Sequence, residues 1–518
     1  MLLKLFVLIL VSSNTNGARI LCVMPQPFYS HQTTFQPIWK ELSLRGHNVT
    51  TIVTDGISDE TLTNLTEIVI GESYDSLQRH NFLDKHLVLE QGFFEIMKEI
   101  EYFIKDLYDV NFGDPRVKSL MNDPNAKFDL VIFEAATYPL VYAWRFNCPS
   151  IGVISMQAPM PYNYAMGNPN HPLMNPDFLL EIDDIGNMTY MEKITSIISY
   201  IVCHVLCYNI FSLYDEIHRK HFGDGIPKTG ELIKNIDMFF EVDNPIFQET
   251  KPVYPHTISI GSGLHIKPTK ALPEDLQEYL DVAKEPVVYF SLGTIVNANL
   301  LNQTDKVAIY EAFSELPYKF LVKADWECVT VPENVKVAKW LPQQDILRHP
   351  SIKLFITQGG LQSLQEAVSN GIPLVGIPFF CDQYQNVQKI VKRGFAVKIS
   401  RHQITKEAVK NAITEVLNNP KYKEKVEEMR DLMYDEPMTS LDKAIWWIEY
   451  VLRHKGAPLF KSKATKMPMY EYLMLDVIAA VLLFSIICSF CIWMLIQLVF
   501  RMVKFMLFGK KVVKIKKN

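Results

Sequence analysis

Two residues far apart in the sequence have the types and surroundings of a catalytic base and its partner. His31 lies in the segment YSHQ, between an apolar run and a stretch with helical spacing, and Glu134 closes the apolar run FDLVIFE. A carboxylate that accepts a hydrogen bond from a histidine ring fixes its tautomer, as a general base requires. We predict this pairing, and we expect the dipole of the following helix to disfavour the imidazolium. A surface histidine and a solvated strand-end carboxylate remain the alternative.

The stretch LFITQGGLQSLQEAVSNGIPLVGIPFFCDQ, residues 354–383, could bind a phosphorylated ligand. Gly359 and Gly360 follow an apolar strand and precede a helix, where backbone amides and the helix N-terminus can approach an anion. Gln362 and Glu366 are four residues apart and therefore share one helix face. Glu366 would then lie below the phosphates, within reach of ribose hydroxyls. The alternative is a glycine turn that serves packing and a solvated helix glutamate.

The elements that must position these residues alternate between strand and helix. ARILCVMP, TTFQPIWKELSLRG and NVTTIVTD form a predicted strand–helix–strand unit, and the same alternation returns after Pro286 with VVYFSLG, YKFLVKA and IKLFITQGG. Such units build parallel sheets, and ligands bind beyond the carboxyl ends of their strands. We predict an α/β protein with two doubly wound, Rossmann-like domains that face a cleft.

The two ends of the chain predict a membrane protein. Residues 1–17 have the pattern of a signal peptide, and residues 477–500 carry no formal charge and are long enough to span a bilayer. Residues 501–518 are basic, so the positive-inside rule places the body in the lumen. The predicted order is a signal peptide (1–17), an N-terminal domain (18–262), a linker (263–285), a C-terminal domain with a returning helix (286–455), a juxtamembrane segment (456–476), a transmembrane helix (477–500) and a cytosolic tail (501–518).

Further features bear on compartment and partners. The tail ends Lys514-Ile-Lys516-Lys517-Asn518, which resembles a dilysine signal for the endoplasmic reticulum, although attraction to anionic lipid explains its charge equally well. Eight cysteines in 518 residues do not make a disulfide framework. A net charge of −5 argues against a nucleic-acid partner. Four Asn-x-Thr sequons could be glycosylated in the lumen: Asn48, Asn64, Asn187 and Asn302.

The pattern F-I-T-Q-G-G-x-x-S-x-x-E, followed by P-L-V-x-x-P-F-x-x-D-Q, closely resembles the signature of the UDP-glycosyltransferases. FSLGT at 290–294, WLPQQDILRHP at 340–350 and both ends of the chain extend the resemblance over nearly its whole length. The resemblance implies a GT-B fold and transfer of a hexose from a UDP-sugar to a small lipophilic acceptor. It makes residues 18–262 the acceptor-binding domain and residues 286–455 the UDP-sugar-binding domain. Its insect-like motifs favour UDP-glucose, in detoxification or in conjugation of hormones or pigments.

The resemblance also implies roles for single residues. His31 would be the base and Glu134, where many relatives have Asp, its partner. Gln358 stands where many relatives have His, and glutamine cannot become cationic. The implied donor site comprises Trp340 and Gln343 at the uracil, Ser291, Gly293, Thr294, Gln358, Gly359, Gly360, Gln362 and Ser363 at the diphosphate, Glu366 at the ribose, and Asp382 and Gln383 at the hexose.

The implied reaction is a single displacement that inverts the anomeric carbon. No two aspartates are spaced as D-x-D, so we expect no metal and no cofactor besides the UDP-sugar co-substrate. The membrane and possible homo- or hetero-oligomers are further expected partners. Two alternatives stay open, a luminal nucleotide-binding subunit that regulates a partner and a transferase of lipid or glycan assembly.

Overall fold

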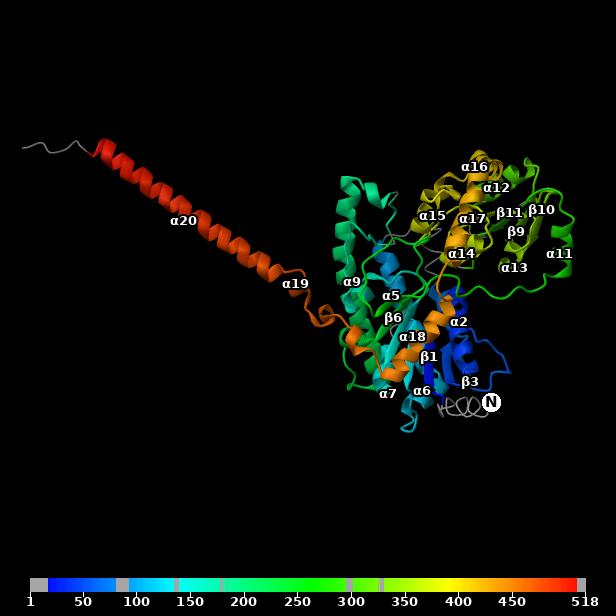
Figure 1. Cartoon of the computed structure of the whole chain (residues 1–518), viewed down its shortest axis with the longest axis horizontal. Coiled ribbons are helices and arrows are strands. Elements are labelled where there is room, and N and C mark those ends of the chain that lie inside the picture. Colours follow the sequence, from blue (N-terminus) through cyan, green and yellow to red (C-terminus); the bar gives the residue numbers. More distant parts are fainter. Residues whose placement is uncertain are drawn as a thin grey trace, which may run out of the picture. The chain divides into compact units, whose positions relative to one another are not determined.

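Two parallel β-sheets organise the computed structural model of the chain. The structure describes residues 17–80, 93–134, 139–177, 180–182, 184–294, 301–324, 326 and 330–509. The chain divides into two units, residues 1–462 and 463–518, and both sheets belong to the first (Figure 1). Residues 1–16 of the predicted signal peptide (1–17) and residues 510–518 of the predicted tail (501–518) lie outside the described residues.

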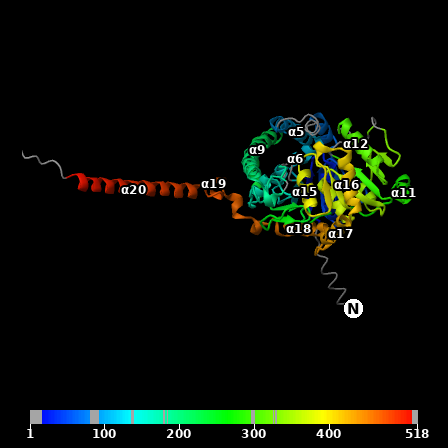
Figure 2. The same cartoon turned by 90° about the horizontal axis from the view of Figure 1, so that it is seen from above.

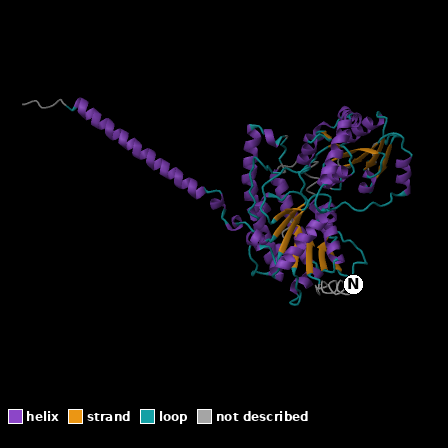
Figure 3. Ribbon diagram, viewed as in Figure 1, coloured by secondary structure: helices purple, strands orange, loops and turns teal. Residues whose placement is uncertain are grey.

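The first sheet has seven parallel strands in the order β3-β2-β1-β4-β5-β6-β7. All residues of β4 and β5 are buried, because helices cover both faces of the sheet. Figure 3 shows its strands separate from those of the second sheet. The strands are β1 (Arg19–Met24), β2 (Asn48–Val53), β3 (Leu65–Val69), β4 (Leu130–Glu134), β5 (Ser150–Ile154), β6 (Met238–Glu241) and β7 (Thr257–Ser259).

Helices follow most strands of this half. The longest, α9, has exposed apolar side chains at Ile197, Ile198 and Ile201 and packs beside α5, as Figure 2 shows. The helices are α2 (Tyr29–Leu44), α3 (Ser73–His80), α5 (Phe93–Gly113), α6 (Pro115–Asn122), α7 (Leu140–Phe146), α8 (Met160–Ala165), α9 (Tyr190–Phe222) and α10 (Thr229–Leu232), with 3₁₀ turns at Ile185–Asn187 and Ile233–Asn235.

The second sheet has six parallel strands in the order β10-β9-β8-β11-β12-β13. They are β8 (Val287–Ser291), β9 (Lys319–Lys323), β10 (Val335–Ala338), β11 (Ile352–Thr357), β12 (Leu374–Gly376) and β13 (Ala396–Lys398). The helices are α11 (Glu274–Asp281), α12 (Gln303–Ser314), α13 (Gln343–Leu347), α14 (Leu361–Ser369), α15 (Gln383–Lys392), α16 (Lys406–Asn418) and α17 (Pro420–Tyr434), with a 3₁₀ turn at Arg401–Gln403. Two doubly wound parallel sheets confirm the predicted fold class.

Helix α18 (Ser440–His454) returns from the second half of the chain to the first sheet. Its apolar side chains Ile445, Ile448 and Val451 recur at helical spacing and are completely buried. They join the core that contains Ile20 and Trp39, and α18 lies beside α2 in Figure 1. The C-terminal half of the sequence thus completes the core of the N-terminal half.

The second unit contains α19 (Met469–Tyr472) and α20 (Leu475–Phe508), after 3₁₀ turns at Pro458–Phe460 and Lys463–Lys466. By length and composition α20 could cross a membrane, and α9 passes the same test. The predicted span 477–500 lies inside α20, which continues through Arg501 and Lys504. Arginine and lysine favour helix, so the basic residues extend it rather than end it.

Candidate active site

The paired His31 and Glu134 lie at the carboxyl edge of the first sheet. Strands β1 and β4 are neighbours, so the segments after them meet at this edge. Helix α2 begins at Tyr29, earlier than predicted, and His31 therefore belongs to its first turn rather than to a loop. The His31 Nδ1 atom is 2.5 Å from Glu134 Oε1, and the two side chains are 19% and 1% exposed. The structure thus brings together the residues that the sequence paired.

The electrostatics of His31 differ from the expectation based on the helix dipole. Burial lowers the pKa of His31, but the charge of Glu134 and the hydrogen bond to it outweigh burial, and the pKa is raised above its ordinary value. The prediction that the helix dipole keeps the His31 ring neutral was wrong, because Glu134 has the larger effect on its pKa. A carboxylate in direct contact stabilises the imidazolium more than the partial charge of a helix end destabilises it.

Two glycines let the loops after β8 and β11 pack closely against their neighbours. Gly293 has φ +82°, and a Cβ there would lie 2.2 Å from Gln358 Nε2. Gly359 has φ +93°, and a Cβ there would lie 2.4 Å from Val387 Cγ2. No other residue type fits either position without displacing its neighbour. The Gln358 side chain consequently packs against the Gly293 turn, directly before the N-terminus of α14.

Glu366, on α14, is the centre of a buried hydrogen-bond network. Gln343 Nε2 donates to Glu366 Oε2 at 2.7 Å and also to Ser363 Oγ at 2.9 Å. Gln344 Nε2 donates to Glu366 Oε1 at 2.8 Å. Burial raises the pKa of Glu366, but His265, Gln343 and Gln344 together lower it by more. The pKa of Glu366 is therefore below its ordinary value. Glu366 is therefore an ionised acceptor rather than a solvated helix glutamate.

Trp340 presents a large aromatic surface to the same cavity. Its side chain is 60% exposed, and Lys323 Nζ lies 4.3 Å from the centroid of its ring. Tyr29 meets the ring edge-on, with centroids 6.0 Å apart. Lys323 Nζ also donates to the Gly293 carbonyl at 3.1 Å. A cation thus lies between the exposed indole and the glycine turn.

Asp382 and Gln383 lie at the start of α15, after β12. Gln383 Oε1 accepts from the backbone N–H groups of Phe379 and Phe380 at 3.0 and 3.3 Å, which leaves its NH₂ group for a ligand. Asp382 Oδ2 accepts from Asn386 Nδ2 at 2.7 Å. Burial raises the pKa of Asp382, and the nearby His31 partly opposes this shift. His31 and Asp382, from different halves of the chain, line the same cavity.

One cavity of about 350 Å³ collects these side chains. The predicted residues that line it are His31, Gly293, Thr294, Trp340, Gln343, Gln358, Gly360, Gln362, Ser363, Glu366, Asp382 and Gln383. Ser291, Gly359 and Glu134 do not line it and support residues that do. Ser291 Oγ, for example, accepts from Gly293 N–H at 3.3 Å. The cavity thus has His31 on one side and the turns at Gly293 and Gly360 on the other.

Residues 19–516 match the model of the family described as UDP-glucoronosyl and UDP-glucosyl transferase. The chain belongs to this family. UDP-glucosyltransferase 2 of Dactylopius coccus is 32% identical over 500 residues, 94% of each chain. UDP-glucuronosyltransferase 2B7 of Homo sapiens is 30% identical over 496 residues, 90% of this chain and 92% of that one.

The solved structures support the fold. A crystal structure of UDP-glucose: anthocyanidin 3-O-glucosyltransferase in complex with UDP superposes with a TM-score of 0.56 at 15% identity. The match covers 85% of this chain and 100% of that one. This UDP-glycosyltransferase therefore has the GT-B fold, and it is a glycosyltransferase by family.

Sequence reasoning missed several side chains that line this cavity of the UDP-glycosyltransferase. Lys323 is the last residue of β9, so the rule that ligands bind beyond strand carboxyl ends could have found it. Tyr29 belongs to the same turn as His31. His265 and Gln344 give no such signal, because His265 falls in the predicted linker and Gln344, although inside the 340–350 motif, has no role implied by the resemblance. All four line the cavity.

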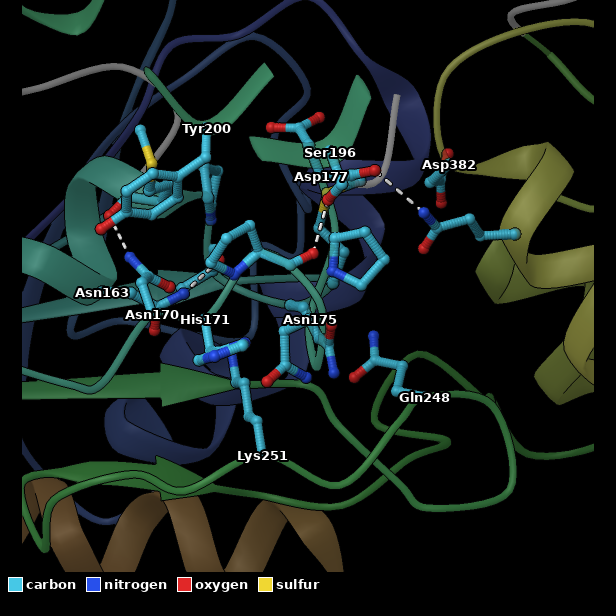
Figure 4. Close-up of a pocket in the computed structure, with 18 of the residues that line it drawn as sticks. Asn163, Asn170, His171, Asn175, Asp177, Ser196, Tyr200, Gln248, Lys251 and Asp382 are labelled. Atoms are coloured by element: carbon cyan, nitrogen blue, oxygen red, sulfur yellow. Dashed lines mark hydrogen bonds between the residues drawn. The ribbon is translucent and has the colours of Figure 1, made fainter. Parts of the chain in front are cut away.

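A smaller pocket of about 70 Å³ adjoins the cavity and shares Asp382 with it (Figure 4). Residues of the first half form most of its wall, including Asn163, Asn170, Ser196 and Tyr200. Several polar groups there bond to the backbone, as Asn163 Nδ2 does to Ala158 O at 2.7 Å and Ser196 Oγ to Pro172 O at 2.5 Å. This wall is therefore held in place by its own hydrogen bonds.

Proposed function

We propose that this UDP-glycosyltransferase transfers glucose from UDP-glucose to a hydroxyl or similar nucleophile of a small lipophilic acceptor, with inversion at the anomeric carbon. The observation that carries the proposal is the position of His31, which is bonded to Glu134 and shares a cavity with Asp382 and the glycine turns. A base and a donor cradle in one cavity also favour an enzyme over a regulatory subunit.

The reaction follows from the tautomer of His31. Its Nδ1–H donates to Glu134, so Nε2 carries the lone pair that takes the acceptor proton. The acceptor oxygen attacks the anomeric carbon, and UDP leaves toward the glycine turn and the start of α14. Backbone amides, Gln358 and Lys323 would meet the charge on the leaving diphosphate, with no metal required.

The charges around the hexose position favour glucose over a uronic acid. Lys267, Lys323 and Arg348 line the cavity near Trp340 and α13, where we place the nucleotide. The hexose would meet Asp382 and the NH₂ group of Gln383. Lys389, on α15, does not line this cavity. Burial lowers its pKa, and the nearby Glu249, Asp243 and Asp382 offset only part of this shift.

We further propose a single-pass protein of the endoplasmic reticulum with luminal catalytic domains. The apolar α20 and the basic residues after it support this orientation. Replacing Lys514 and Lys516 with serine should let protein reach later compartments, as measured by acquisition of complex glycans. Unchanged retention would assign residence to the membrane helix or a partner instead.

Microsomes that contain the protein test the activity. They are incubated with labelled UDP-glucose, UDP-glucuronic acid and UDP-galactose and a panel of phenols, steroids and lipids, beside microsomes with the His31→Ala variant. We expect transfer from UDP-glucose to at least one phenol or steroid, and none by the variant. UDP binding without turnover of any donor would favour a regulatory subunit, and transfer only to lipids would favour lipid assembly.

A further inference from the structure

The segment 261–270, between the two sheets, forms part of the wall of the donor cavity. Gly263 N–H donates to Gln365 Oε1 at 3.0 Å, which ties the segment to α14. Lys267 N–H donates to Gln344 Oε1 at 2.9 Å, which ties it to α13. Gln344 in turn donates to the carbonyl of His265 at 3.2 Å. These reciprocal bonds hold the segment as a fixed part of the site rather than a loose connection.

His265 is the side chain that this segment places against Glu366. It is 3% exposed, and its Nε2 atom lies 3.2 Å from the Gln362 carbonyl and 3.4 Å from Glu366 Oε1. Both neighbours are acceptors, so Nε2 must carry the hydrogen. A buried ring N–H is therefore shared between the backbone of α14 and a buried carboxylate.

The side chains of Gln343, Gln344 and His265 occupy most of the hydrogen-bond acceptor sites of the Glu366 carboxylate. A carboxylate offers about four lone-pair sites, two on each oxygen. Gln344 and His265 face Oε1, whereas Gln343 alone donates to Oε2. The capacity that remains lies on Oε2, so the position of His265 decides which oxygen meets a ligand.

We infer that His265 is a positioning residue for the nucleotide, and that its Nε2–H holds the Glu366 carboxylate so that Oε2 accepts from a ribose hydroxyl. The inference rests on the proposed function, in which Glu366 binds the ribose. It assigns a role in donor recognition to the segment between the two domains. A merely structural role would make His265 matter equally for nucleotides with and without ribose hydroxyls.

Nucleotide affinity distinguishes these roles. Dissociation constants for UDP and 2′,3′-dideoxy-UDP are measured by calorimetry on the full-length chain in detergent, for the wild type and for Glu366→Gln, His265→Leu and His265→Gln. The matched control is His256→Leu, which removes a buried histidine (0% exposed) that bonds to the Phe460 carbonyl at 2.8 Å and does not line the cavity.

We expect the wild type to prefer UDP over the dideoxy nucleotide by about tenfold or more, the effect of a hydrogen bond to a charged group. His265→Leu should lose most of this preference by weakening UDP binding alone, and it should raise KM for UDP-glucose more than it lowers kcat. His265→Gln keeps an N–H donor of similar reach and should restore the preference. His256→Leu should leave it unchanged.

Each other result overturns a stated part of the argument. If Glu366→Gln abolishes the preference but His265→Leu keeps it, His265 does not position Glu366. If Glu366→Gln keeps the preference, Glu366 does not bind the ribose, and this part of the proposed function is wrong whatever His265 does. If His265→Leu unfolds, His265→Asn replaces it, because the shorter amide reaches the position of Nδ1 but not that of Nε2. An Asn variant that prefers UDP as strongly as the wild type does would refute the inference.

Discussion

Replacing Glu134 with glutamine separates the charge of the base's partner from its shape. Glutamine keeps an oxygen that can accept from His31 Nδ1–H, so the ring should stay in place at the 2.5 Å contact while the negative charge disappears. Hydrogen bonds to charged groups contribute about 1.5 to 3 kcal/mol, and Glu134 is buried enough that solvent screens little of this. We therefore expect kcat to fall by about ten- to a hundredfold.

The pH profile of the same variant gives a second, independent readout. The charge of Glu134 raises the pKa of His31, and only neutral His31 can act as the base. In the wild type, kcat/KM should therefore fall as the pH drops through this raised pKa. In Glu134→Gln the pKa is no longer raised by the carboxylate, so the acidic limb should move to lower pH.

The assay is initial-rate transfer from saturating and limiting UDP-glucose across pH 5 to 9, with wild type and variant purified alike. UDP affinity serves as the control, because Glu134 does not line the donor cavity. An acidic limb that stays in place, or moves to higher pH, would contradict the assignment of His31 as the base that Glu134 orients.

The remaining predictions concern three more positions. His31→Ala should abolish transfer while UDP binds almost as in the wild type, measured by calorimetry, and an active variant would remove His31 from the mechanism. Asp382→Ala should lower kcat/KM for the sugar donor by about ten- to a hundredfold and leave UDP affinity unchanged. If the affinities for UDP and for the UDP-sugar fall equally, Asp382 has a structural role instead. Gly359→Ala, whose Cβ would meet Val387, should lower the free energy of unfolding by about 1 to 3 kcal/mol, and Gly71→Ala, which meets nothing within 4 Å, should change it little.

Much of the site was predictable because it depends on strand ends. Glu134 closes β4 and Gly359 follows β11, and the carboxyl edges of parallel strands bring such residues together whatever the details of the helices. A regular pattern of apolar runs in the sequence is enough to locate these edges.

The remainder depends on contacts that no spacing encodes. His265 meets Glu366 across 101 residues of chain because backbone N–H groups of the segment 261–270 donate to side chains of α13 and α14. The pKa of His31 depends on a 2.5 Å contact competing with burial and a helix dipole, and only coordinates decide which effect is larger. Sequence patterns therefore predict where a site lies better than they predict its electrostatics.

The return of α18 to the first sheet has a consequence for the order in which the chain is made. Residues 19–259, which include every strand of the first sheet, emerge from the ribosome well before Ile445, Ile448 and Val451 are synthesised. Each such side chain contributes about 1.5 to 3 kcal/mol when buried. The half that is synthesised first must therefore wait, with an uncovered apolar face beside α2, until the other half has emerged. A nascent chain arrested before residue 440 should bind chaperones more strongly than one arrested after residue 460.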